Sequence, residues 1–193
     1  MPKKLIFMIG APGSGKSTYS DKINAMHAED IHSIHIGEIL GEEIRQGTTM
    51  GKIVQQYVEK GDLVPGDVIL YEVFKHIKAS PKDIVLMDGF PRGLNQMKIL
   101  GDTLAQDKEI KLISVIELKV SKEVARERIL PENASEEEVA LFEHKYETYE
   151  ALIGKIEKFY ADKELLTVIS AEKERDLVLK RIDDHLKNLV ELH

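Results

Sequence analysis

A glycine-rich segment near the start of the chain constrains the fold more than any other feature. It reads G-A-P-G-S-G-K-S-T over residues 10–18, so a glycine, four residues, a second glycine, a lysine and a hydroxyl residue follow in order. Glycines let the backbone curl until successive N–H groups point at phosphate oxygens, and the N-terminus of a following helix adds partial positive charge. We interpret the segment as a P-loop rather than as a glycine-rich turn with an incidental lysine.

This loop predicts a binding site for a nucleoside triphosphate, which we expect to be ATP with Mg²⁺. Lys16 is expected to bridge the outer phosphates, and Ser17 to offer its hydroxyl to the metal ion. The residues expected to contact the nucleotide are Gly10, Ala11, Pro12, Gly13, Ser14, Gly15, Lys16, Ser17 and Thr18.

Short apolar runs alternate with helix-like segments along the chain, which predicts an α/β fold with a parallel sheet covered on both faces. The glycine-rich loop lies between one such run and a segment of helix-compatible composition, residues 16–27. A length of 193 residues allows one compact domain with small excursions, but not two large domains. The runs of strand length are 4–10, 84–87, 112–118 and 166–169.

Composition excludes several classes of protein. A net charge of -7 argues against a general nucleic-acid or anionic-membrane surface, because those partners require clustered lysine and arginine. The absence of cysteine excludes disulfides, thiolate metal sites and a cysteine nucleophile. The apolar stretch 5–9 is too short for a signal-peptide core or a membrane span. We therefore expect a soluble cytoplasmic protein without nucleic-acid or membrane partners.

Two segments stand outside the alternation of strands and helices. Residues 37–76 are long, helix-like and punctuated by glycine and proline, and residues 130–138 contain a proline and an acidic run. Ser135 with Glu138 fits a capping box, so the acidic run is interpreted as a solvated helix start. From Phe142 to Tyr160 the apolar and aromatic residues recur at spacings of three and four, which favours a core-facing helix over a base-stacking platform.

Asp88 directly follows the apolar run 84–87, where a carboxylate could serve a Mg²⁺·phosphate site at the end of a strand. Taken alone, such an aspartate is more often a turn or helix-capping residue. Together with the P-loop, it is interpreted as a metal-site aspartate that acts with Ser17. The seven histidines show no ligand spacing, and none is assigned a role.

The segment D-G-F-P-R-G-L-N-Q, residues 88–96, together with the glycine-rich loop, resembles the adenylate kinases and related nucleoside monophosphate kinases. The resemblance implies a three-layer P-loop kinase fold with a parallel central sheet. Its parts are a core of residues 1–35, 67–128 and 142–193, a helical monophosphate-binding insertion of residues 36–66, and a short lid of residues 129–141. The implied activity is reversible transfer of the γ-phosphoryl group of ATP to a nucleoside monophosphate, AMP above all, by a protein expected to be a monomer.

The resemblance also implies roles for individual residues. Arg92 would grip the acceptor phosphate, Gln96 would read the adenine edge, and Arg128 would lie beside the ATP base; with Lys16 and Asp88, the two arginines form the expected catalytic set. The residues expected to contact the acceptor are Ile36, Gly37, Asp62, Leu63, Val64, Gly89, Phe90, Pro91, Arg92 and Gln96.

This chain also departs from the family pattern. Gly41 stands where the family carries a second acceptor-phosphate arginine, and Ile36 and Glu38 replace a small residue and an aspartate. Arg45, one helical turn further on, could reach back, although a shifted root rarely reproduces bidentate geometry.

Residues 129–148 contain no arginine, where the family usually has several, and only Lys145 falls near an expected one. Two alternatives therefore stay open beside the enzyme: a nucleotide-binding protein of the same fold with weak or no transfer, and a small-metabolite kinase.

Overall fold

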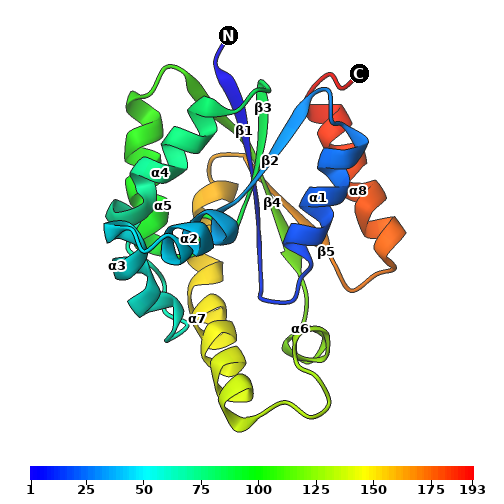
Figure 1. Ribbon diagram of the computed structural model, residues 1–193. Coiled ribbons are helices and arrows are strands. Elements are labelled where there is room, and N and C mark those ends of the chain that lie inside the picture. Colours follow the sequence, from blue (N-terminus) through cyan, green and yellow to red (C-terminus); the bar gives the residue numbers. More distant parts are fainter.

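Figure 1 shows a computed structural model of residues 1–193, in which a central sheet lies between two groups of helices. The sheet has the strand order β2-β3-β1-β4-β5, and every neighbouring pair is parallel. The predicted parallel α/β fold is therefore confirmed. The strands are β1 Lys3–Gly10, β2 Ile31–His35, β3 Ile84–Asp88, β4 Ile110–Lys119 and β5 Leu166–Ser170.

Helices cover both faces of this sheet. In Figure 1, α1 and α8 lie on one side, and α4 and α5 lie on the other, with α2 and α3 below α4 and α5 in this view. The long helix α7 packs against α5 and β5 and extends past the end of the sheet. The helices are α1 Lys16–Met26, α2 Ile36–Arg45, α3 Thr49–Val58, α4 Gly66–Ala79, α5 Leu94–Gln106, α6 Lys122–Ile129, α7 Glu136–Ala161 and α8 Arg175–Leu189.

The four predicted strands are present, and β2 is a fifth strand that the sequence did not indicate. Its sequence I-H-S-I-H buries only Ile31 and Ile34, and this three-residue spacing does not give the alternation expected of a half-buried strand. Because β2 is an edge strand that pairs with β3 alone, it tolerates polar residues, and these residues prevented its prediction from the sequence.

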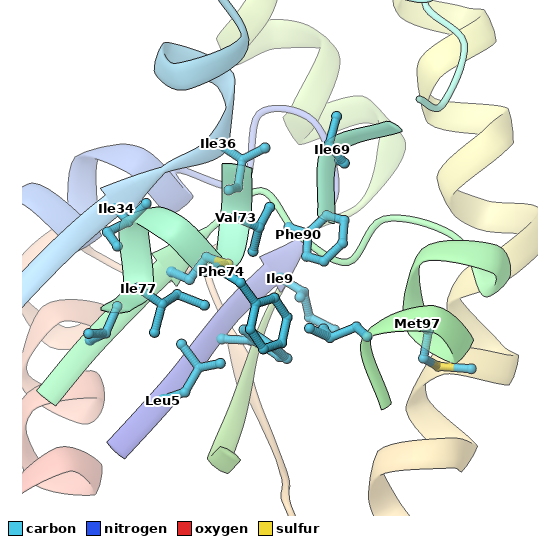
Figure 2. Packing of buried hydrophobic residues seen from close by; sticks show 14 of the residues in the cluster. Leu5, Ile9, Ile34, Ile36, Ile69, Val73, Phe74, Ile77, Phe90 and Met97 are labelled. Carbon is cyan, nitrogen blue, oxygen red and sulfur yellow. The ribbon is translucent and has the colours of Figure 1, made fainter. Parts of the chain in front are cut away.

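Strand β1 supplies side chains to two separate cores. Leu5, Phe7 and Ile9 point to the face covered by α4, α5 and α7, whereas Ile6 and Met8 point to the face covered by α1 and α8. Figure 2 shows the first core, in which the labelled β1 side chains approach those of α4. Each such burial contributes about 1.5–3 kcal/mol, so the strand that leads into the P-loop is firmly held.

The long helix α7 begins at Glu136, six residues before the predicted apolar stripe. Ser135 accepts a hydrogen bond from the Glu138 backbone, and the Glu138 side chain accepts one from the Ser135 backbone, so the predicted capping box is confirmed. The stripe is core, as predicted: its buried members are Phe142, Tyr146, Ile156 and Tyr160.

No helix of the structure is both long enough and apolar enough to cross a membrane.

Candidate active site

The glycine-rich loop connects β1 to α1 in a shape that only glycine permits. Gly10 has φ 149°, and a Cβ there would lie 2.3 Å from the carbonyl oxygen of Leu118. Gly13 has φ 80°, and a Cβ there would lie 2.7 Å from the carbonyl oxygen of Ala125. Both contacts are too short for any side chain, so the loop curls tightly between β4 and α6 before the helix begins.

Lys16 folds back over this loop. Its Nζ donates hydrogen bonds to the carbonyl oxygens of Gly10 and Ala11, each at 3.0 Å. Enclosure by the loop, and then the charge of the nearby Arg92, lower the pKa of Lys16 to about 8, and Asp88 opposes this shift. The ammonium group thus lies inside the concavity in which a phosphate would be held.

Ser17 and Asp88 meet as the sequence predicted. The Ser17 hydroxyl donates to Asp88 Oδ2 at 2.5 Å, while Asp88 Oδ1 is buried and has no partner. Burial by itself would raise the pKa of Asp88, but hydrogen bonds from His35 and Ser17, with the charges of Lys16 and Arg92, hold it below its ordinary value. An ionised carboxylate with an unpaired buried oxygen beside a hydroxyl suits a hard cation.

No group of three or more histidine, aspartate or glutamate side chains is placed to hold a metal ion. A cation at Ser17 and Asp88 would therefore need further oxygen ligands from phosphate and water. Mg²⁺ is commonly bound in this way, through one or two carboxylates plus substrate phosphates.

His35 is a site residue that sequence inspection missed. Its Nδ1 lies 3.2 Å from Asp88 Oδ2, and its Nε2 lies 2.8 Å from Asp21 Oδ1. The hydrogen bond with Asp88 is the main cause that raises the pKa of His35 to about 9, so the ring is charged at neutral pH. The contact arises because His35 of β2 pairs in register with Asp88 of β3, and no local signal in one sequence reports that pairing.

A cavity of about 260 Å³ opens beside the P-loop, between the end of β3, helix α2, the loop before α4 and helix α7. Three cationic side chains line it: Lys16, Arg92 and Lys145. Arg92 Nε donates to the carbonyl oxygen of Gly89 at 2.9 Å. Partial enclosure, and then the charge of Arg92, lower the pKa of Lys145. Such a gathering of positive charge in an acidic protein favours an anionic ligand.

Gln96 lines the same cavity but already makes two hydrogen bonds within the chain. Its Nε2 donates to the carbonyl oxygen of Val64 at 2.7 Å, and its Oε1 accepts from the Arg92 backbone N–H at 2.7 Å. One N–H and one lone pair of the amide remain for a ligand. The side chain therefore also ties the loop before α4 to the Arg92 backbone.

The structure brings most of the predicted site residues to one cavity wall. The predicted residues that line the cavity are Gly10, Pro12, Lys16, Ile36, Gly37, Asp62, Leu63, Val64, Gly89, Phe90, Pro91, Arg92 and Gln96. Residues of α7 that the sequence did not single out for this site also line it, namely Thr148, Tyr149, Ile153 and Ile156.

Arg128 lies outside this cavity and contacts the P-loop from the other side. Its Nη2 donates to the carbonyl oxygen of Ala171 at 2.8 Å, and its Nη1 makes a longer contact of 3.4 Å with that of Gly13. The first turn of α7 exposes its three consecutive glutamates to solvent, in agreement with a solvated helix start. On α7 itself, His144 Nε2 lies 2.8 Å from Asp62 Oδ1 and so links the helix to the loop before α4.

Comparison with known proteins identifies the family. The model of the adenylate kinase family matches residues 8–184. The adenylate kinase of a Sulfurovum species is 39% identical over an alignment of 189 positions that covers 94% of this chain and 96% of that protein. The adenylate kinase of Campylobacter concisus is 37% identical over 97% of this chain and 100% of its own length, and that of Helicobacter hepaticus is 34% identical over 96% and 98%. With its P-loop, its cationic cavity and this extent of similarity, the chain belongs to the adenylate kinase family.

Proposed function

We propose that this protein transfers the γ-phosphoryl group of ATP reversibly to AMP, with the P-loop holding ATP and the neighbouring cavity holding the acceptor. The observation that carries the proposal is the convergence of Lys16, Arg92 and Lys145 on one cavity beside the glycine-rich loop. The protein would work as a cytoplasmic monomer, and the absence of cysteine suits a reducing compartment.

On the donor side, the loop N–H groups and Lys16 would bind the β- and γ-phosphates of ATP. Lys16 would exchange its two carbonyl partners for phosphate oxygens, which are stronger acceptors for an ammonium group. Mg²⁺ would be held by Ser17 and by Asp88, and would neutralise charge on the phosphates. Arg128, which contacts the P-loop from outside, would lie near the ATP base.

On the acceptor side, Arg92 would bind the phosphate of AMP, because a planar guanidinium matches two phosphate oxygens. Gln96 would offer its remaining N–H and lone pair to the adenine edge, while Leu63 and Val64 would contact the base. Ile36 makes the wall of this cavity more apolar than the family pattern predicts. An apolar wall with one amide suits a flat purine better than a polar metabolite.

Transfer itself requires no side-chain nucleophile, since positioning and charge neutralisation account for most catalysis of phosphoryl transfer. Residues 129–141 are proposed as a short lid that closes over the donor phosphates. Because this lid carries no arginine, Lys145 would be the cation of α7 nearest to the transferring group.

A coupled assay with ATP and each of AMP, GMP, CMP and UMP tests the proposal. We expect turnover with AMP at the highest kcat/KM and loss of turnover in Lys16→Ala. Binding of ATP without transfer to any monophosphate would instead indicate a non-catalytic nucleotide-binding protein. Transfer to a small metabolite alone would indicate a metabolite kinase. No observation on this chain favours either alternative.

A further inference from the structure

Helix α2 contributes no charged side chain to the acceptor side of the cavity, and Gly41 is the position where one is expected. Helix α2 faces the cavity with Ile36, Gly37, Leu40, Gly41 and Ile44, none of which carries a charge. Gly41 occupies the position where the family resemblance predicts a second arginine for the acceptor phosphate. Arg92 would then be the only arginine that lines the cavity to neutralise the phosphate dianion of the acceptor, with the lysines Lys16 and Lys145 as the other cations there.

The space above Gly41 is occupied by another residue. A Cβ built at Gly41 has one neighbour within 4 Å outside its own helical backbone, which is Nη1 of Arg45 at 3.4 Å. The reason is helical geometry: Cα–Cβ bonds tilt toward the helix N-terminus, so a long side chain covers the turn before its own. Arg45 comes four residues after Gly41 and ends α2, so its guanidinium lies over the glycine.

The nitrogen that lies over Gly41 is free. Nε of Arg45 donates to Glu42 Oε2 at 2.9 Å, and Nη2 donates to the same oxygen, whereas Nη1 forms no hydrogen bond within the chain. The Arg45 and Glu42 side chains are 67% and 49% exposed, and an ion pair so open to water contributes little stability. Glu42 also accepts a hydrogen bond from Gln46 at 2.7 Å, so it keeps a partner if Arg45 moves.

We infer that Arg45 supplies the missing second cation of the acceptor-phosphate site by reaching across Gly41 from one helical turn further along α2. This inference rests on the proposed function. The absence of a side chain at Gly41 is what makes the reach possible, since any larger residue there would stand between the guanidinium and the cavity. In the free protein Arg45 pairs with Glu42. When the acceptor binds, Arg45 would exchange this carboxylate for the phosphate, which carries more negative charge and attracts the guanidinium more strongly.

The inference is tested by steady-state kinetics on the full chain with Arg45→Ala. We expect the KM for AMP to rise about tenfold or more, with the KM for ATP changed less than about twofold, because removing a cation from the acceptor site leaves the P-loop intact. Arg181→Ala is the matched control: it removes the same exposed charge from α8, on the opposite face of the sheet, and should behave as the wild-type protein.

Two further variants separate phosphate binding from support of α2. Glu42→Gln also breaks the ion pair but leaves Arg45 free, so its KM for AMP should stay unchanged or fall; a rise equal to that of Arg45→Ala would overturn the inference. Adding Gly41→Arg to Arg45→Ala should restore the KM for AMP, because it returns a cation to the same wall. A KM for AMP in Arg45→Ala within about twofold of wild type would likewise overturn it.

Failure of the proposed function would be seen in the wild-type protein, not in the variant. If wild type binds AMP by titration calorimetry but transfers no phosphate, the comparison is made on the AMP dissociation constant. Weaker binding by Arg45→Ala then supports the inference, and equal binding overturns it. Absence of AMP binding by the wild-type protein would overturn both.

Discussion

Glu117, a buried carboxyl beneath the site, should make the stability of the protein depend on pH. This carboxyl on β4 is fully buried, and its Oε2 has no hydrogen-bond partner. The Tyr149 hydroxyl donates to Oε1 at 3.0 Å, and Glu157, which pairs with Lys119 at 2.7 Å, lies beside it. Burial, and then the neighbouring carboxyl of Glu157, raise the pKa of Glu117 from 4.5 to about 7.

A raised pKa means that the bound proton stabilises the folded state. The stabilisation is complete below the unfolded value of 4.5 and is lost as the pH rises through about 7. A shift of this size corresponds to about 3.5 kcal/mol at most, since each pKa unit is worth about 1.4 kcal/mol. A glutamine at this position would not ionise, yet its N–H can still donate to Glu157 and its carbonyl can still accept from Tyr149. Glu117→Gln should therefore match wild type near pH 5 and exceed its stability at pH 8 by up to about 3.5 kcal/mol.

Urea unfolding followed by far-ultraviolet circular dichroism at pH 5, 6, 7 and 8 measures this difference. Glu127→Gln, which changes an exposed glutamate on α6, is the control and should follow the pH dependence of the wild-type protein. A gap between Glu117→Gln and wild type that is the same at pH 5 and pH 8 would refute the reasoning, because it would show that Glu117 does not change its ionisation over this range.

Three further outcomes are expected at the site. Lys16→Ala should weaken Mg·ATP binding by about tenfold or more without unfolding the chain, as titration calorimetry and circular dichroism will show. Arg92→Ala should raise the KM for AMP while leaving ATP affinity nearly unchanged; equal reductions in affinity for both nucleotides would contradict its assignment to the acceptor. Turnover with saturating ATP and AMP should fall below the roughly 1–100 s⁻¹ typical of kinases, and Lys145→Arg should increase it, since guanidinium binds phosphate bidentately.

The part of the fold that the sequence predicted is the part encoded by local patterns. The apolar runs of β1, β3, β4 and β5 are continuous, and the glycines after β1 satisfy a motif with a physical reason at each position. Strand β2 was not predicted, because its polar residues do not form the pattern of a strand. They are tolerated because β2 lies at the edge of the sheet, and its own sequence does not report that position. Once β2 is missed, His35 cannot be connected to Asp88, since only the strand register brings them together.

Gln96 shows a second limit of sequence reasoning. The motif predicts a side chain free to read a base, but the structure also uses its amide to join Val64 to the Arg92 backbone. A variant such as Gln96→Ala would therefore disturb the position of Arg92 as well as base recognition. A loss of AMP affinity in that variant alone could not assign a base contact, whereas a change in preference between AMP and GMP could.

The two places where the chain lacks family arginines should affect different kinetic constants. The place on α2 concerns binding of the acceptor, and the place in the lid concerns turnover. Helix geometry allows a missing charge to be replaced from the next turn, so Arg45 can compensate for Gly41 within α2. No arginine can compensate in the same way in the lid, because residues 129–148 contain none, and Lys145 is the only cation of α7 that lines the cavity.

Contacts to the acceptor phosphate act on bound substrate and transition state alike, whereas cations aimed at the transferring group act mainly in the transition state. The chain should therefore bind AMP with an ordinary KM and transfer phosphate slowly. A low KM together with a high kcat would show that a group outside the cavity, brought in when the lid closes, replaces the missing arginines.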